Sequence, residues 1–266
     1  MSFPDRIAQS KIIEIVLTVL VYCIYTAVIA ASIAPSVWLL LRVLPGLIGP
    51  VVSGQAAAHV AAVQAAVVLA GALYLYVFFG SIVQAGMVRL LSLGIKPGRY
   101  PAISLTTIRW LIYSGIYTIS IRTVLPLIPV TFATNMYFRI VGCRMGRNVK
   151  LNTFILNDAY LLTIEDDVII GGGTDVSCHL FENNQLILKP IHIGKGSLIG
   201  ARSYIAPGVR IGARCVIGLQ SYIRSDHVIP DGSVITSLAG IDVRTAREIE
   251  RGRLGPNRRA GTGRKE

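Results

Sequence analysis

His179 is the histidine of this sequence whose neighbours best suit acid–base chemistry. Glu182 follows it along the chain and Asp158 precedes it. An imidazole titrates near neutral pH, so it can take a proton from an attacking amine or hydroxyl, and a carboxylate can orient its ring. We therefore expect His179 to be a general base, with Glu182 or Asp158 as its orienting partner. The plainer alternatives are a surface or loop-anchoring histidine, a loop charge at Glu182 and a turn-forming residue at Asp158.

The cysteines and the remaining histidines offer less. Cys178 directly precedes His179, but adjacent side chains on a strand point to opposite faces, which argues against a cysteine–histidine nucleophile pair. No two cysteines are spaced as C-x-x-C, and the histidines lack the close pair typical of zinc sites. We expect His192 in solvent, His227 packed in a small-residue position, and no bound metal.

A six-residue repeat must position these side chains. Isoleucine recurs at every sixth residue, at Ile193, Ile199, Ile205, Ile211, Ile217, Ile223, Ile229 and Ile235. A period of six matches neither the 3.6 of a helix nor the 2 of an alternating strand, but it suits short strands joined by corners, with one aliphatic side chain facing the axis. The pattern predicts a left-handed parallel β-helix of the hexapeptide-repeat type, with about five coils over residues 145–240.

The repeat extends towards the N-terminus and is broken once. Its earlier members are Met145, Leu151, Ile164, Ile170 and Val176. Residues 177–190 do not follow the hexad, so we expect them to bulge from the coil as a loop. His179 stands at the start of this loop, at the edge of a coil. Departures from a regular solenoid are often where function is built, which favours His179 as the site.

The first half of the chain is too apolar for an ordinary soluble domain. Of 266 residues 53% are hydrophobic and 15% charged, and the mean hydropathy is +0.60. No charged residue lies between Ile15 and Leu41, a run longer than the roughly 20 residues that span a hydrocarbon core. We predict a transmembrane helical hairpin within residues 1–102, from Ile12 to about Leu44 and from about Val60 to Leu91. A cleaved signal peptide is the alternative, but the run is too long for one and no small-residue cleavage site ends it.

Residues 103–142 form a second apolar part. Arg109 and Arg122 interrupt it, so we expect an interfacial or re-entrant linker rather than a third span. Basic residues flank both outer ends of the hairpin, and by the positive-inside rule both ends are cytoplasmic. The sequence thus predicts a protein of the bacterial cytoplasmic membrane, with the β-helix of residues 143–240 on the cytoplasmic side.

The net charge of +12 does not indicate nucleic-acid binding. Four basic residues follow the uncharged stretch that ends at Phe138, at Arg139, Arg144, Arg147 and Lys150, and the tail of residues 241–266 is basic. No aromatic residues alternate with these charges as on a nucleic-acid surface. We therefore expect attraction to anionic membrane lipid, no nucleic-acid partner, and a partly disordered tail.

Three stretches carry a more specific resemblance. Residues 137–149, 158–167 and 179–182 resemble the membrane-embedded C-terminal region of epsilon-poly-lysine-synthetase-type nonribosomal peptide synthetase-like proteins. The likeness covers residues 103–240. In that family an adenylation domain and a carrier domain precede tandem membrane-linked β-helix units that resemble acetyltransferases. This chain has neither domain and a single β-helix unit, so peptide synthesis by this chain alone is not expected.

The resemblance implies a membrane-anchored acyltransferase that works in trans. Its donor would be a thioester, either acyl-CoA or the phosphopantetheine arm of a carrier protein, with no permanently bound cofactor, and its acceptor an amine or a hydroxyl. Arg202 and Arg214 occupy outward positions of successive coils and could contact a donor phosphate, unless they are merely solvated. A carrier or adenylation protein would be a partner. By analogy with soluble hexapeptide-repeat transferases we expect a homo-oligomer, most simply a trimer.

Two other classes of function stay open. One is a noncatalytic membrane-bound scaffold, in which the loop docks a partner. The other is an O-acetyltransferase of a glycan or lipid, which differs from an amide-forming enzyme in having a hydroxyl acceptor.

Overall fold

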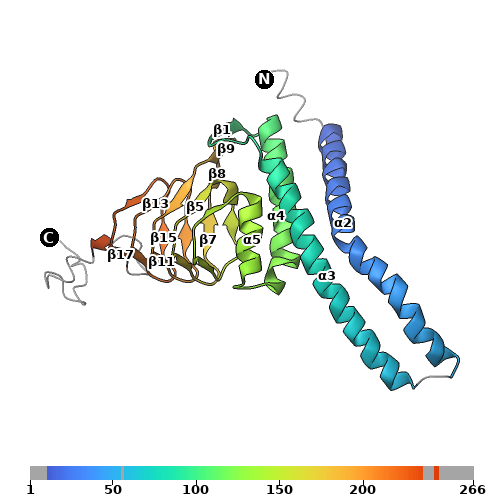
Figure 1. Cartoon of the computed structure of the whole chain (residues 1–266). Helices are drawn as coiled ribbons and strands as arrows, with labels where there is room; N and C mark the ends of the chain where they lie inside the picture. Colours follow the sequence, from blue (N-terminus) through green and yellow to red (C-terminus); the bar gives the residue numbers. More distant parts are fainter. Residues whose placement is uncertain (1–10, 55–56, 236–242, 246–266) are drawn as a thin grey trace, which may run out of the picture. The chain divides into compact units, whose positions relative to one another are not determined.

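The chain folds into two units in a computed structural model that describes residues 11–54, 57–235 and 243–245 (Figure 1). The helical unit consists of the residues up to 95 together with residues 101–128, and the coiled unit consists of residues 96–100 and those from 129 onward. The expected linker of residues 103–142 is divided between them. Helix α4 (Leu105–Thr123) belongs to the helical unit, and helix α5 (Phe132–Val141) belongs to the coiled unit.

Two long apolar helices, α2 (Lys11–Val52) and α3 (Ala58–Ser92), dominate the helical unit. Both are long and apolar enough to cross a membrane, and most of their side chains are exposed. Polar groups join them where they pack together: the Ser36 hydroxyl donates to the Ala72 carbonyl at 2.7 Å, and the amide of Gln84, a fully buried side chain, lies 3.5 Å from the hydroxyl of Ser32. Such interhelical hydrogen bonds are typical of helices that associate in an apolar medium.

Helix α4 continues through the charge at Arg109. Ser104 caps its first turn by accepting the Thr107 N–H at 3.1 Å. The Arg109 guanidinium donates to the carbonyls of Leu91, at 2.8 Å, and Leu93. The carbonyls at the end of a helix lack partners within the helix, and a cation is favoured beside them. Arg109 therefore joins α4 to the C-terminal end of α3 rather than ending an apolar segment.

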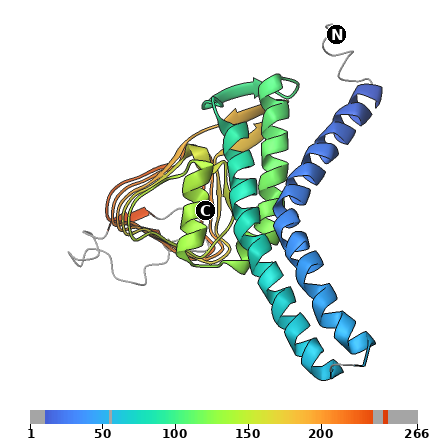
Figure 2. The same cartoon turned by 45° about the vertical axis from the view of Figure 1, so that its right-hand side comes forward.

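The coiled unit is a left-handed parallel β-helix, as the repeat predicts. Its strands are β2 (Arg144–Met145), β3 (Lys150–Leu151), β4 (Leu156–Asn157), β5 (Leu162–Ile164), β6 (Ile169–Ile170), β7 (Asp175–Ser177), β10 (Ile191–Ile193), β11 (Leu198–Ile199), β12 (Tyr204–Ile205), β13 (Arg210–Ile211), β14 (Val216–Ile217), β15 (Tyr222–Ile223), β16 (Val228–Ile229) and β17 (Ser233–Ile235). They stack in register as three parallel sheets: sheet B (β2, β5, β10, β13, β16), sheet C (β3, β6, β11, β14, β17) and sheet D (β4, β7, β12, β15). Strand β18 (Val243–Thr245) adds to β17 in the antiparallel sense. Figure 2 shows the coils stacked over one another.

The core of the prism is the column of hexad side chains. All eight isoleucines from Ile193 to Ile235 are buried, with at most 5% of their surface exposed. They stack on one another from coil to coil, as Ile193 does on Ile211 and Ile199 on Ile217. The small residues of the repeat, among them Ser197, are buried at the corners. This confirms the fold class that the period of six predicts.

The interruption after Val176 is an ordered hairpin rather than an irregular loop. Strands β8 (His179–Glu182) and β9 (Gln185–Leu188) pair in the antiparallel sense. Asn183 and Asn184 form the two-residue turn with φ of 49° and 59°, the geometry that a type I′ turn requires and that asparagine tolerates. A third strand, β1 (Gly98–Pro101), lies beside β9 in the order β1, β9, β8.

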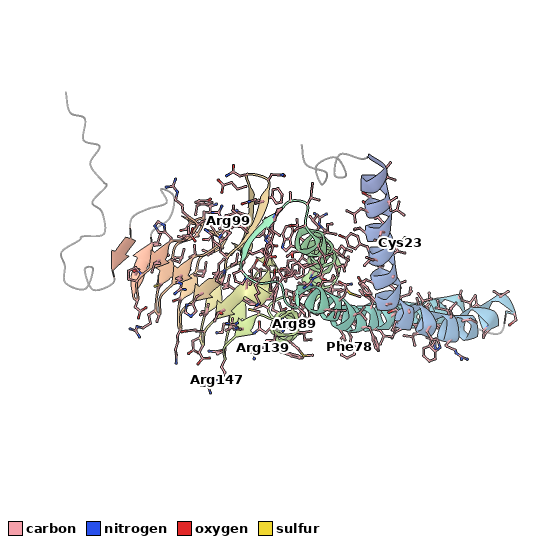
Figure 3. The ribbon with its side chains drawn as sticks, turned by 90° about the horizontal axis from the view of Figure 1, so that it is seen from above. Cys23, Phe78, Arg89, Arg99, Arg139 and Arg147 are labelled. Carbon is pink, nitrogen blue, oxygen red and sulfur yellow. The ribbon has the colours of Figure 1, made fainter. Side chains whose placement is uncertain are left out.

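Helix α5 packs at the first coil of the prism. Its Asn135 donates to the Val149 carbonyl at 2.8 Å and its Arg139 to the Gly146 carbonyl at 2.5 Å. Arg139 and Arg147 project from the same side of this unit (Figure 3). The basic tail expected at residues 241–266 lies outside the described residues, except for β18.

Candidate functional site

The candidate site is a histidine–aspartate pair at one corner of the prism. This corner joins sheet D to sheet B. Asp158 follows β4 in one coil, and His179 follows β7 in the next. The Nδ1 atom of His179 lies 2.5 Å from Oδ2 of Asp158. The aspartate is 1% exposed, whereas the imidazole is 26% exposed, so the pair places a buried carboxylate behind a ring that solvent can reach.

The backbone explains why Asp158 points at the next coil. The hexad spacing is irregular here: Leu156 follows Leu151 by five residues, Ile164 follows Leu156 by eight, and a 3-10 turn, η2 (Ala159–Leu161), lies in the longer interval. Asp158 precedes this turn in a left-handed conformation, with φ of 57°, and its carbonyl accepts the Leu161 N–H at 2.8 Å. Aspartate tolerates this conformation better than most residues. Asp158 thus forms the turn and also contacts His179.

The surroundings raise the pKa of His179. Burial alone lowers it, but the hydrogen bond and the charge of Asp158, with a further contribution from Asp175, more than compensate and set the pKa above its usual value. Because Asp158 holds Nδ1, proton transfer to and from this ring would use the other nitrogen, Nε2. The arrangement can orient an imidazole and stabilise the imidazolium that forms when it accepts a proton.

Polar side chains of sheet D surround the pair. The Ser177 hydroxyl lies 3.5 Å from Nδ1 of His179 and donates to the His179 carbonyl at 3.1 Å. Asp175 accepts a hydrogen bond from Asn157 at 3.0 Å, and partial burial raises its pKa. Tyr204, opposite Asp175 in the next coil, hydrogen-bonds to Ser177. This polar surface beside the imidazole could bind an acceptor.

The Cys178 thiol is not available as a nucleophile. Its side chain is fully buried, and burial, with the charge of Asp158, raises its pKa well above the usual value. A thiol reacts as the thiolate, and this environment keeps it protonated. The structure therefore agrees with the expectation that Cys178 and His179 do not form a nucleophile pair.

The remaining sequence candidates lie elsewhere. Glu182 is exposed at the turn of the hairpin, where it pairs with Gln185. Arg202 and Arg214 are exposed at two other corners, with φ of 57° and 54°. Arg202 follows β11 and Arg214 follows β13. The structure thus brings Asp158 to His179, and no contact joins Glu182, Arg202 or Arg214 to it among the described residues.

The other histidines have separate surroundings. His192 pairs with Glu165, with Nε2 and Oε1 3.1 Å apart, and both side chains are partly in solvent, as expected for His192. His227 is exposed, so the expectation that it is packed is wrong: at this corner the side chain turns outward instead of filling the small-residue position. Within residues 11–54, 57–235 and 243–245, no three His, Cys, Asp or Glu side chains cluster as metal ligands would.

Sequence reasoning does not identify three of the residues that lie near His179. Asp175 and Tyr204 each precede a hexad aliphatic residue, and Ser177 follows one. An outward side chain precedes every hexad residue, so the repeat does not distinguish these positions. Only the stacking of coils shows that they share one sheet with the site. The break of the repeat after Val176 is the one signal that marks this region in the sequence.

Comparison with known proteins identifies the repeat. Residues 190–225 match the family described as bacterial transferase hexapeptide (six repeats). The chain is 30% identical over 172 residues to the delta-poly-L-ornithine synthetase of Acinetobacter baumannii (strain AB307-0294), which covers 64% of this chain and 12% of that protein. It is 23% identical over 103 residues to the putative acetyltransferase YvoF of Bacillus subtilis (strain 168), covering 38% of this chain and 59% of that protein.

A solved structure of a galactoside acetyltransferase in complex with coenzyme A is similar in fold, with a TM-score of 0.41 and 20% identity. The similarity covers 61% of this chain and 92% of that chain. The chain spans less than two thirds of either curated relative. The period of six, the buried isoleucine column and the family match agree on one assignment. Within the coiled unit, residues 190–225 match the bacterial transferase hexapeptide repeat.

Proposed function

We propose that the chain is an acyltransferase in which His179 is the general base and Asp158 orients it. The observation that carries the proposal is the 2.5 Å contact between Nδ1 of His179 and the buried Asp158 carboxylate. It lies where the repeat is interrupted, in a unit built from a repeat named for transferases. Burying the Asp158 carboxylate costs desolvation free energy. A buried carboxylate that shifts the pKa of an imidazole within reach of solvent is typical of a functional site, which favours a catalytic role over a purely structural one.

In the proposed reaction the acceptor approaches Nε2 of His179. The nitrogen or oxygen of the acceptor forms a bond to the thioester carbonyl carbon while Nε2 of His179 takes the acceptor's proton. The resulting tetrahedral intermediate collapses, the carbon–sulfur bond breaks, and the imidazolium returns the proton to the leaving thiolate. Asp158 stabilises the imidazolium between the two proton transfers. The donor is a thioester, from acyl-CoA or from a carrier protein, and Arg202 and Arg214 are candidates for contacting its phosphates.

Two versions of the proposal differ in the acceptor, and we favour an amine. The delta-poly-L-ornithine synthetase relative is named for an amide polymer of a diamino acid, and Asp175, on the surface next to His179, supplies a carboxylate that an ammonium group can approach. A hydroxyl acceptor, on a glycan or a lipid, is the competing version. A scaffold without catalysis requires no aligned imidazole, and the pair argues against it.

We propose that α2 and α3 anchor the protein in a bacterial cytoplasmic membrane with the coiled unit on the cytoplasmic side. Both helices are long, apolar and largely exposed. The basic side chains Arg139 and Arg147 on one side of the coiled unit would favour contact with anionic headgroups (Figure 3).

We propose further that the coiled unit assembles as a homo-oligomer, most simply a trimer. Sheet C carries an outward aliphatic column of Ile169, Leu198 and Val216, which stack in register and are 39%, 40% and 41% exposed. A contiguous exposed apolar column of this kind is typical of an interaction surface.

The test of acyl transfer uses the full chain in detergent. Acetyl-CoA, longer acyl-CoA thioesters and an aminoacyl-loaded carrier protein are each incubated with amine acceptors and with hydroxyl acceptors, and the products are identified by mass spectrometry. We expect a new amide with at least one thioester. An ester instead would select the hydroxyl version. The proposal would be contradicted if the native chain and a His179→Ala chain consumed the thioester at the same rate with every combination of donor and acceptor.

A further inference from the structure

The hairpin that begins with His179 is completed by a strand from a distant part of the chain. Strand β9 lies between β8 and β1 in a three-stranded sheet (Figure 1). β1 comes from residues 98–101, in the connection between α3 and α4. Residues 93–97 join it to the end of α3, and residues 102–104 join it to the start of α4. Along the chain, α3 therefore leads into β1, and β1 leads into α4.

The sheet holds the backbone of His179 from one side. His179 lies opposite Leu188 of β9 in the antiparallel register. The neighbouring residues Leu186, Ile187 and Leu188 are all buried, at most 3% exposed. Consecutive side chains of a strand point to opposite faces, so both faces of β9 are packed. A movement of β9 would therefore move His179 relative to Asp158, which belongs to the coil before the hairpin.

The third strand matters because a two-stranded hairpin is only marginally stable in water. β1 supplies the missing pairing along the free edge of β9. A local hydrogen bond holds the start of β1 to the residues before it: the Tyr100 hydroxyl donates to the Lys96 carbonyl at 2.8 Å. Its charged side chain, Arg99, is exposed. The carboxylates that act on the imidazole are Asp158, from the corner after β4, and Asp175, from β7. β1 acts through backbone pairing and not through charge.

We propose that β1 is a positioning strand for His179. By pairing with β9 it holds the hairpin, and through the hairpin the imidazole, against Asp158. The effect on turnover rests on the proposed function, whereas the effect on the pair itself does not.

Two single substitutions test the pairing, Arg99→Pro and Tyr100→Pro. Successive N–H groups of a strand point to opposite sides, so one of the two residues directs its N–H towards β9 and the other directs it away. Proline removes the donor. One variant therefore breaks a bond to β9, and the other is its matched control. Arg99→Ala and Tyr100→Ala separate the loss of each side chain from the loss of the N–H.

Two measurements are made on the full chain in detergent micelles. The first is amide hydrogen exchange of residues 185–188. The second is titration of the His179 ring by NMR, with its signal identified by its disappearance in His179→Gln. We expect one proline variant to speed exchange in β9 about fivefold or more, the change for one lost backbone hydrogen bond. In that variant the titration midpoint of His179 should fall, because the imidazole loses part of its contact with Asp158.

The outcomes are distinct. Faster exchange in β9 with an unchanged titration of His179 would refute the positioning role, and so would unchanged exchange in both proline variants. If either proline also speeds exchange in β13–β17, the repeat has been disturbed, and the comparison is made with Arg99→Gly/Tyr100→Gly, which weakens the strand but keeps both donors. If no acyl transfer is found with any substrate, the titration still decides the inference, so the two proposals fail separately.

Discussion

Oδ2 of Asp158 lies 2.5 Å from Nδ1 of His179. Asp158 makes this contact from a corner of the prism, where its backbone adopts a left-handed conformation. The two residues belong to consecutive coils, so the contact exists only when those coils are stacked. The carboxylate is buried while the ring reaches solvent. A general base that is oriented in this way gives the following expectations.

Replacement of His179 by alanine should lower the rate of acyl transfer about 100- to 10,000-fold, the usual contribution of a general base. The side chain lies outside the isoleucine column, so the β-sheet circular dichroism should not change. His192→Ala is the matched control, because His192 also pairs with a carboxylate, Glu165, but on another sheet. A His179→Ala chain that keeps more than a third of the rate would eliminate this residue as the base.

Asp158→Asn should lower kcat and also change its pH dependence. In the native protein the base is active when neutral, so activity rises as the pH increases through the raised pKa of His179. The asparagine removes the charge that raises this pKa and leaves the burial that lowers it. The rising limb of the profile should therefore move to lower pH, as measured by kcat/KM from pH 5 to 9. A limb that stays in place would show that Asp158 does not set this pKa.

Ile205→Ala should destabilise the coiled unit by about 2–5 kcal/mol, because it leaves a cavity in the fully buried hexad column. Val228→Ala, at a side chain that is 67% exposed on β16 of sheet B, should change stability by less than about 0.5 kcal/mol. Denaturant unfolding followed by circular dichroism gives both values. Equal effects of the two substitutions would be incompatible with the stacked core.

Leu198→Lys should dissociate the oligomer, because it puts a charge in the middle of the aliphatic column on sheet C. Val228→Lys introduces the same charge on sheet B and should leave the assembly intact. Mass photometry in mild detergent measures the mass of each form. A native chain that is monomeric at all concentrations and still active would refute the proposed trimer.

Reporter fusions test the topology. A reporter after residue 266 and one before residue 1 should both report a cytoplasmic location, whereas one inserted at residues 55–56 should report the opposite side. An external location of the C-terminal reporter would mean that the chain crosses the membrane a third time, in residues 103–138.

The sequence predicts the coiled unit well because its period is local. Each hexad aliphatic residue signals its own burial, and the break after Val176 marks where the hairpin emerges. The pairing of β1 with β9 leaves no such signal, since it joins residues far apart in the chain through backbone groups that every residue has. The choice of Asp158 over Glu182 as the neighbour of His179 also depends on stacking. Glu182 is closer in sequence, but the hairpin carries it away from the corner.

The coil period also restricts how the length of such a chain can change. After the hairpin, residues eighteen apart occupy equivalent positions, as Ile193 and Ile211 do. Removing one hexad would turn every later strand onto the next face, whereas removing a whole coil would only shorten the prism. Between Asp158 and His179 even a whole added coil would separate the pair by one more layer. Insertions and deletions in homologues should therefore come in units of eighteen residues beyond Ile193, and the interval from Asp158 to His179 should keep its length.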